Sequence, residues 1–521
     1  MEENTIRPEL AQLYQRLANT GDQARGEDAA KRHKKSYRTA RENLADLVDD
    51  NSFLEYGQLA VAAQRNRRSY EELQTRTPAD GIITGTATIN AALHGVEAAQ
   101  AAVVVNDYSV LAGTQGYFHH KKLDRICEVA RENKLPVIMY TEGGGGRPGD
   151  TDITTPIAGL NVTSFTAWAG LSGQCLRIAV ANGYCFAGNA ALFGSADITI
   201  ATRAANIGMA GPAMIEGGGL GSFKPSEIGP AAEQEKNGVV DILADDEAHA
   251  TALAKQLLSY FQGPVRRWTA SEQNLLRDLI PKDRRFAYPV RRIIEQVADS
   301  DSFLELRRVY GRSVITGFMR LEGIPVGVLA NDCQQLGGAV DAEAAEKAAR
   351  FIQLCDAFAL PLVSFTDTPG FMVGPDSERA ASVRRMSRLF VAGANVSVPV
   401  IAVFLRKGYG LGAMAMVGGD FTAPTYACAW PTGEFGGMGL EGAVRLGFSK
   451  ELAAVEDEAK RQQLFDSLVA KMYEQGKATE AASHLELDAV IDPADTRAVL
   501  LRALRASRDK RPPRRRFVDT W

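Results

Sequence analysis

Cysteine and histidine are scarce in this chain, with six of each among 521 residues. No two cysteines form a C-x-x-C pair, which argues against a zinc ribbon, and their wide spacing argues against a disulfide framework. No metal site is therefore expected. The motifs G-x-S-x-G, H-E-x-x-H and G-x-x-x-x-G-K-S/T are also missing. If the chain is an enzyme, its chemistry has to come from a cofactor or from main-chain groups.

An excess of one charge and long apolar runs are missing too. The 59 basic and 63 acidic residues give a formal net charge of −4, which offers no electrostatic case for a nucleic-acid partner. The longest strongly apolar run, residues 396–405, is far shorter than the roughly 20 residues that cross a bilayer. The first residues contain no apolar signal-peptide core. We expect a soluble, cytoplasmic protein with no membrane partner.

The most informative feature that is present is an internal repeat. Five short segments recur in register with one separation, 225 positions, which predicts a duplicated domain. We place the two copies at residues 31–270 and 281–514. The matching segments are Asn106-Asp107 and Asn331-Asp332, Leu111-Ala112-Gly113 and Leu336-Gly337-Gly338, Leu135-Pro136-Val137 and Leu360-Pro361-Leu362, Thr141-Glu142 and Thr366-Asp367, and Gly183-Tyr184 and Gly408-Tyr409.

Each copy alternates predicted strands with predicted helices. The clearest helix covers residues 343–358, where an apolar stripe of helical period is broken only by Lys347. This alternation predicts an α/β fold with a largely parallel, buried sheet, and ligands bind at the carboxyl ends of such strands. Both glycine clusters of each copy fall at those ends. The predicted strands cover residues 81–90, 101–106, 136–140 and 178–181, and then 314–331, 361–365 and 398–405.

The second glycine cluster of each copy, residues 182–190 and 406–414, runs from a strand into a helix-compatible segment. Free N–H groups at such a turn can bind an anion or stabilise a carbonyl oxygen that gains charge. Small residues are needed there because side chains would block the approach of a ligand. The alternative is a tight strand-to-helix turn without a ligand, which becomes less attractive because the feature occurs twice.

The first glycine cluster, residues 142–149, suits close approach by a phosphate or a pantetheine chain, and its counterpart, residues 367–374, is stiffer. A dinucleotide fingerprint also fits at Gly408, Gly410 and Ala413. No acidic residue ends a second strand about 20 residues further on, where a ribose would need it, so this interpretation is weak.

The chain resembles the carboxyltransferase (β) subunits of biotin-dependent acyl-CoA carboxylases, such as the propionyl-CoA and methylcrotonyl-CoA enzymes. The resemblance covers about residues 30–510 and implies two tandem crotonase-like domains, in agreement with the repeat. It rests on Asp80-Gly81 with Thr84-Gly85, Tyr108-Ser109-Val110-Leu111-Ala112-Gly113, Gly144-Gly145-Gly146-Arg147, Asp367-Thr368-Pro369-Gly370-Phe371, Arg406-Lys407-Gly408-Tyr409-Gly410 and Ala429-Trp430-Pro431.

The resemblance also implies a mechanism. Carboxybiotin releases CO2, its ureido nitrogen takes the acyl-CoA α-proton, and the thioester enolate attacks CO2. The hole for the thioester oxygen falls on the amides of Ala187 and Gly188, although a glycine pair is more usual there. The hole for the biotin ureido oxygen falls on the amides of Leu411 and Gly412. The first domain is thus the acyl-CoA side and the second the biotin side.

Further expectations follow from the same resemblance. Coenzyme A would lie along Gly113, Lys122, Gly144, Gly145, Gly146 and Arg147. No A-M-K-M-like biotinylation site is present, so a separate biotin carboxylase and biotin carrier are expected, on a homo-hexameric core. Residues 433–439 are richer in glycine than in the common family version, which predicts a roomier acyl pocket.

Three other interpretations remain. The same glycine motifs would serve the α subunit of a biotin-dependent acyl-CoA decarboxylase. A hydratase or thioesterase of the crotonase type needs only one copy and a catalytic carboxylate. A non-catalytic subunit that scaffolds an assembly would differ only in lacking activity.

Overall fold

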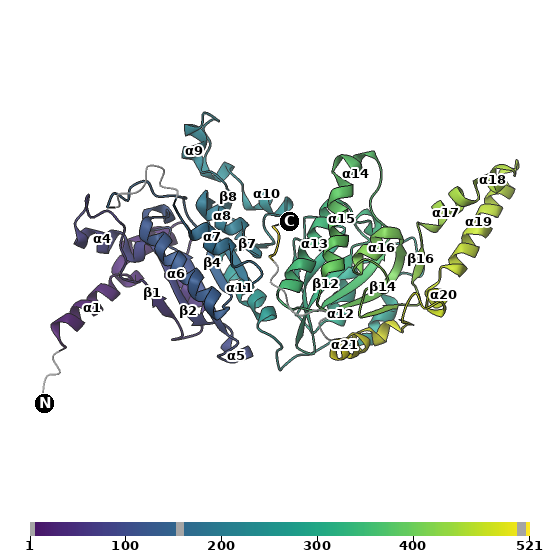
Figure 1. Cartoon of the computed structure of the whole chain (residues 1–521), viewed down its shortest axis with the longest axis horizontal. Helices are drawn as coiled ribbons and strands as arrows, with labels where there is room; N and C mark the ends of the chain where they lie inside the picture. Colours follow the sequence, from purple (N-terminus) through teal and green to yellow (C-terminus); the bar gives the residue numbers. More distant parts are fainter. Residues whose placement is uncertain (1–5, 153–160, 508–516, 521) are drawn as a thin grey trace. The chain divides into compact units, whose positions relative to one another are not determined.

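The chain forms two compact units, of which the first extends to Gly263 and the second begins at Pro264. A computed structural model describes residues 6–152, 161–507 and 517–520. Each unit contains one large sheet with helices packed against it (Figure 1). Unit 1 is coloured purple to teal and unit 2 green to yellow. The two α/β units match the predicted duplication.

The large sheet of unit 1 has the order β1-β2-β3-β4-β5-β7-β9. The first three strands pair antiparallel, and every later pair is parallel. The strands are β1 (Leu54–Tyr56), β2 (Ile82–Thr88), β3 (Gln100–Asn106), β4 (Val137–Tyr140), β5 (Arg177–Ala181), β6 (Tyr184–Phe186), β7 (Ile198–Thr202), β8 (Asn206–Gly208) and β9 (Ile242–Ala244), with β6 and β8 paired separately. The helices are α1 (Pro8–Ala18), α2 (Gly26–His33), α3 (Ala40–Leu47), α4 (Tyr70–Arg76), α5 (Ala91–His94), α6 (Tyr117–Asn133), α7 (Ser164–Ala169), α8 (Gly188–Gly194), α9 (Pro212–Gly217), α10 (Ala231–Lys236) and α11 (Glu247–Phe261).

Unit 2 repeats this topology, with the order β10-β11-β12-β13-β14-β15-β17 and β16 paired to the end of β14. Its strands are β10 (Leu304–Leu306), β11 (Val314–Leu321), β12 (Ile324–Asn331), β13 (Leu362–Thr368), β14 (Val400–Tyr409), β15 (Tyr426–Ala429), β16 (Glu434–Gly436) and β17 (Ala489–Val490). Its helices are α12 (Val290–Val297), α13 (Ala342–Ala357), α14 (Pro375–Arg379), α15 (Ser382–Asn395), α16 (Gly410–Met416), α17 (Leu440–Gly447), α18 (Ser449–Ala453), α19 (Glu458–Gln475), α20 (Ala478–Ser483) and α21 (Thr496–Ala506).

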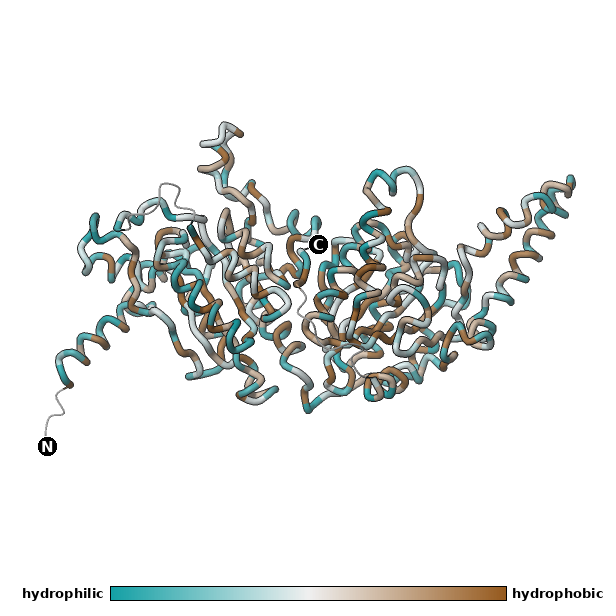
Figure 2. The backbone as a smooth tube through the Cα atoms, viewed as in Figure 1, coloured by the Kyte–Doolittle hydropathy of each residue, from teal (hydrophilic) through white to brown (hydrophobic). Residues whose placement is uncertain are grey.

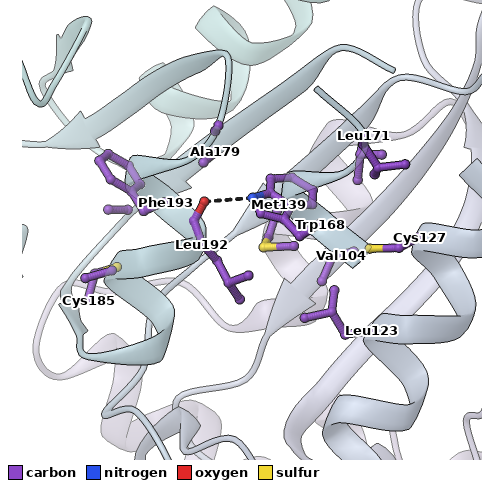
Figure 3. Close-up of a cluster of buried hydrophobic side chains, with 14 of the residues drawn as sticks. Val104, Leu123, Cys127, Met139, Trp168, Leu171, Ala179, Cys185, Leu192 and Phe193 are labelled. Carbon is purple, nitrogen blue, oxygen red and sulfur yellow. Dashed lines mark hydrogen bonds between the residues drawn. The ribbon is translucent and has the colours of Figure 1, made fainter. Parts of the chain in front are cut away.

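The core of each unit lies along its parallel strands, which are buried on both faces and therefore rich in valine, isoleucine and alanine. Figure 2 shows hydrophobic segments along these strands, whereas α1 alternates hydrophilic and hydrophobic residues and buries none of them. In unit 1 the fully buried Trp168 packs among Val104, Leu123 and Met139 (Figure 3). Its indole Nε1 donates to the carbonyl of Leu192 at 2.8 Å, which satisfies its only polar group. All six cysteines are buried and free.

A buried lysine occurs at the same position of both copies, on α6 and on α13. Lys122 Nζ donates to the carbonyl of Ala79 at 3.0 Å and to that of Ile82, the first residue of β2. Lys347 lies 225 positions later and donates to Val314, the first residue of β11. Each lysine therefore holds the first residue of an antiparallel strand, β2 in unit 1 and β11 in unit 2.

Lys347 explains the break in the apolar stripe of residues 343–358. Its ammonium donates to the carbonyls of Arg307 at 2.8 Å, Tyr310 at 3.0 Å and Val314 at 2.7 Å. A long side chain can bury its aliphatic stem and still present its charge to acceptors. The position thus packs as an apolar residue would and adds three hydrogen bonds.

Replacing Lys347 by methionine should change how stability depends on pH. Burial lowers the pKa of Lys347 to about 7, below the 10.5 of the unfolded chain. Between these values the unfolded chain binds a proton that the folded chain does not, so this lysine makes stability rise with pH, by up to about 1.4 kcal/mol per unit. The unfolding free energy of the wild type, minus that of Lys347→Met, should therefore increase from pH 7 to pH 10 in denaturant titrations. A difference that stays constant over this pH range would contradict this.

Candidate active site

The two glycine clusters of unit 1 lie side by side. The Gly143 N–H donates to Tyr184 O at 2.7 Å, and the Phe186 N–H donates to Gly143 O at 3.0 Å. These bonds join the turn after β4 to β6, which leads directly into α8. A Cβ on Gly145 would lie 2.7 Å from the Cβ of Ala187, so only glycine allows this approach. The sequence predicted both clusters at the ends of strands, and the structure brings them together.

The hydrogen bonds of this turn fix the direction of one amide. Gln115 N–H donates to Gly145 O at 2.7 Å, and Arg147 N–H donates to Gln115 O at 2.9 Å. In such a parallel bridge the intervening residue, Gly146, turns its own N–H away from Gln115. The Gly146 N–H has no acceptor within the part of the chain that the structure describes. This amide is therefore available to a ligand.

Unit 2 has the same arrangement. Val340 N–H donates to Gly370 O at 3.0 Å, and Met372 N–H donates to Val340 O at 2.9 Å, so Phe371 turns its N–H away from Val340. A Cβ on Gly412 would lie 2.7 Å from the Phe371 nitrogen. Residue 412 must therefore be glycine for the turn to approach the start of α16.

The structure corrects the register of the second glycine clusters. Gly143 forms a parallel bridge with Cys185, and its counterpart Thr368 pairs with Gly408. The separation there is 408 − 185 = 223, whereas matching Gly183 with Gly408 gave 225. The second copy is two residues shorter between its turn and its helix. Ala187 therefore corresponds to Gly410, with φ of 52° and 57°, and Gly188 corresponds to Leu411.

Gly188 and Leu411 present matched amides at the starts of α8 and α16. Neither N–H donates to any acceptor among the described residues. The prediction for Ala187 was wrong, because its N–H donates to Gly208 O, in β8, at 3.0 Å. Ala187 instead shapes the elbow before α8, in a backbone region (φ 52°, ψ −121°) that favours glycine. Gly412 lies one residue further into α16, and its amide role stays a prediction.

The residues predicted to contact coenzyme A separate into two groups. Gly144 and Gly146 are exposed on the turn. Gly113 and Gly145 are buried beneath it, and a Cβ on Gly113 would lie 2.6 Å from Glu142 O. Gly113 is therefore needed for the turn to pack and is not a surface for a ligand.

Arg147 and Lys122 are turned inward, which contradicts the prediction that they bind coenzyme A. The Arg147 side chain is 3% exposed and forms an ion pair with the fully buried Asp80. Its Nη2 also donates to Thr114 O at 2.8 Å. Burial raises the pKa of Asp80, although the guanidinium opposes this shift. Lys122 is bound to carbonyls as described above, and burial lowers its pKa to about 8. Neither cation is free to meet a phosphate.

Two of the strings that carry the resemblance, which begin at Asp367 and at Arg406, meet in one buried cluster of unit 2. Arg406 Nη2 lies 3.0 Å from an Asp367 carboxylate oxygen, and Tyr288 OH donates to the same oxygen at 2.8 Å. Lys407 N–H donates to the other carboxylate oxygen at 3.0 Å. Burial and the neighbouring carboxylate raise the pKa of Tyr288. The cluster fixes the end of β14 against the turn that carries Phe371, a link that the sequence did not reveal.

Sequence reasoning also missed the buried ion pair below the unit 1 turn. Arg32, in α2, donates to both carboxylate oxygens of Glu142, at 2.9 and 2.7 Å. Burial raises the pKa of Glu142, against the effect of Arg32. Arg32 lies 110 residues from Glu142, so no local pattern could pair them. Within the described residues, no group of His, Cys, Asp and Glu is arranged to hold a metal ion, and no helix is long and apolar enough to cross a membrane.

Comparisons with known proteins agree along the whole chain. The model of the carboxyl transferase domain matches residues 31–517. The methylmalonyl-CoA carboxyltransferase 12S subunit of Propionibacterium freudenreichii subsp. shermanii is 32% identical over 97% of this chain and 95% of its own length. A transcarboxylase 12S crystal structure, described as a hexamer with methylmalonyl-CoA bound, has a TM-score of 0.84 and 29% identity over 98% and 96% of the two chains.

A second solved structure is more similar in sequence. It is a single-chain, multi-domain long-chain acyl-CoA carboxylase, with a TM-score of 0.91 and 55% identity over 96% of this chain. The present chain spans 49% of that protein. The match covers both units.

Proposed function

The chain belongs to the carboxyl transferase family, and we propose that its two matched main-chain sites bind the acyl-CoA thioester oxygen and the biotin ureido oxygen. As a member of this family it is an enzyme that transfers a carboxyl group between biotin and an acyl-CoA, with two tandem crotonase-like domains. Unit 1 takes the acyl-CoA side and unit 2 takes the biotin side. Their boundary, between Gly263 and Pro264, lies a few residues before the end of the first predicted domain, residues 31–270, and the second predicted domain, residues 281–514, lies within unit 2.

The observation that carries this proposal is a pair of main-chain amides, at the same place in each unit, that donate to no acceptor among the described residues. In unit 1, Gly188 at the start of α8 and Gly146 on the adjoining turn donate to the thioester oxygen. The α-carbon loses its proton, and the electron pair moves toward this oxygen, which gains negative charge. One preorganised donor of this kind stabilises a transition state by about 2.7–4 kcal/mol. Gly146 here replaces Ala187 as the second donor.

In unit 2, Leu411 and Phe371 donate to the ureido oxygen. Bound carboxybiotin supplies CO2 and, at its ureido nitrogen, the base for the α-proton. Two N–H groups without a neighbouring acceptor fit a carbonyl oxygen that becomes anionic when the carboxyl group leaves. Leu411 as a residue is 61% exposed. Because Gly412 has no side chain, the turn that carries Phe371 can lie close to the start of α16.

Coenzyme A lies along the exposed residues of the first glycine turn, Gly144 and Gly146. Gly113, Gly145 and Arg147 support that turn from beneath, whereas Lys122 holds the entry of β2. The biotin is carried by a separate domain and is carboxylated by a biotin carboxylase, on a partner subunit or elsewhere in the assembly. We further propose a homo-hexameric core, as the resemblance implies, and the cytoplasmic location that the sequence predicts.

The substrate class that we propose is long-chain acyl-CoA. This rests on the 55% identity to a long-chain carboxylase and on the glycines after β16. A Cβ on Gly437 or on Gly439 would meet no atom within 4 Å. The segment runs beside the unit 2 site, where Gly437 O would lie 2.8 Å from a Cβ on Gly410. The lack of neighbouring atoms at these two glycines is compatible with the roomier acyl pocket that the sequence predicts for residues 433–439.

A panel of acyl-CoA substrates tests this assignment. With the biotin-bearing partner present, fixation of labelled bicarbonate should show kcat/KM at least about 10-fold higher for long acyl chains than for propionyl-CoA, since each further methylene buried adds roughly 0.8 kcal/mol. Gly437→Leu fills the open space and should lower only the long-chain rate. Rapid turnover of propionyl-CoA with rejection of longer chains would refute the substrate class. Lack of transfer to every acyl-CoA would refute the function.

A further inference from the structure

Gln115 places a side-chain amide directly beside the proposed thioester site. A Cβ on Gly188 would lie 2.2 Å from Gln115 Oε1 and 3.1 Å from the ring of Phe165, so the two side chains flank the Gly188 α-carbon. Gln115 is 3% exposed. Its main chain is the partner that fixes the Gly145 and Gly146 turn. Gln115 therefore touches both sources of the unit 1 donors.

The Gln115 side chain has no hydrogen bond that explains its presence. Its Nε2 is buried and has no acceptor within residues 6–152, 161–507 and 517–520. Buried polar groups are almost always paired, and leaving a donor unpaired costs about 1–3 kcal/mol. A group kept at that cost needs a reason other than stability.

The second copy supplies a comparison within the same chain. Val340 lies 225 positions after Gln115 and makes the same two main-chain hydrogen bonds, to Gly370 and from Met372. Val340 is fully buried and apolar. The fold thus accepts a hydrocarbon side chain at this position, and the turn needs no amide there. The carboxamide is particular to the unit that takes the acyl-CoA.

We propose that the Gln115 side-chain amide is a third donor to the acyl-CoA thioester oxygen, beside the amides of Gly188 and Gly146. This rests on the proposed function. The terminal torsion of glutamine is soft, so a half-turn of the carboxamide places Nε2 where Oε1 now faces Gly188. As the α-C–H bond breaks and its electrons move to the thioester oxygen, the Nε2–H bond strengthens its interaction with that oxygen. Gln115 gives up no proton.

The test replaces Gln115 by methionine, which keeps its length, and by valine, which copies Val340. Both variants should lose about 10²-fold in kcat, the loss typical of one oxyanion-hole donor, with the KM for acyl-CoA changed less than about 3-fold because the interaction strengthens in the transition state. Gln115→Glu should lose more, because a carboxylate repels the developing charge. The melting temperature should stay the same or rise, because an unpaired buried donor has been removed.

Four outcomes separate the possibilities. A kcat within about 3-fold of wild type in Gln115→Met would overturn this inference and leave the proposed function intact. A loss of activity that follows a lower melting temperature would mean a structural role and would overturn it too. A wild-type enzyme that carboxylates no acyl-CoA would defeat the proposed function itself. Low kcat with unchanged stability and KM is the result that supports the inference.

Discussion

Replacing Arg147 by methionine should destabilise unit 1 by about 3–5 kcal/mol, because it leaves the carboxylate of Asp80 buried without a partner. Both side chains are almost fully buried, at 3% and 0% exposure. Asp80 also accepts the His119 N–H at 2.7 Å, so the uncompensated charge sits at the start of α6. The turn that carries Gly146 would lose its anchor to Thr114 as well.

Hydrogen exchange of peptides from residues 100–147 measures this loss locally. Asp80→Asn combined with Arg147→Met should be less destabilising than the sum of the single variants, because the double variant buries no unpaired charge. Arg125→Met is the matched control, since the Arg125 side chain is 56% exposed and its pairing with Glu128 contributes little. Equal protection in Arg147→Met and Arg125→Met would contradict the supporting role assigned to Arg147.

The general fold was predictable because its signals are local or repeated. The helix expected over 343–358 is α13, Ala342–Ala357, and the strand expected over 178–181 is β5, Arg177–Ala181. Apolar strands buried on both faces and helices of clear period leave their pattern in adjacent residues. The internal repeat then gave the duplication without any knowledge of the sheet order.

The details of the site depend on contacts between distant residues, and there the sequence was insufficient. Ala187 failed as a donor because Gly208, on another strand, accepts its N–H. The identical dipeptides at Gly183 and Gly408 suggested the wrong register, since a two-residue difference in loop length leaves no mark in the motif itself.

Charged residues gave the least reliable predictions. Arginine and lysine are residue types that commonly bind phosphate, yet the side chains of Arg147 and Lys122 already have partners within unit 1. Whether a cation faces solvent or a buried acceptor is decided by tertiary packing, which a single sequence does not show. Phe371 was missed for a related reason, because a main-chain donor can be supplied by any residue type except proline.

The amide of Leu411 gives the sharpest test of the main-chain mechanism. Leu411→Pro deletes the N–H, and proline is tolerated in the first turn of a helix because no intrahelical bond is lost there. Leu411 is 61% exposed, so little packing changes. Leu411→Ala is the matched control, because it shortens the same side chain and keeps the amide.

The decisive measurement is the rate of carboxyl transfer by Leu411→Pro and Leu411→Ala, with their melting temperatures recorded in parallel. If the Leu411 N–H stabilises the ureido oxygen, the proline variant loses about 10²–10³-fold in kcat while the alanine variant stays near wild type. Both should melt close to the wild-type temperature. Equal rates in two equally stable variants would contradict the claim that main-chain amides carry this chemistry.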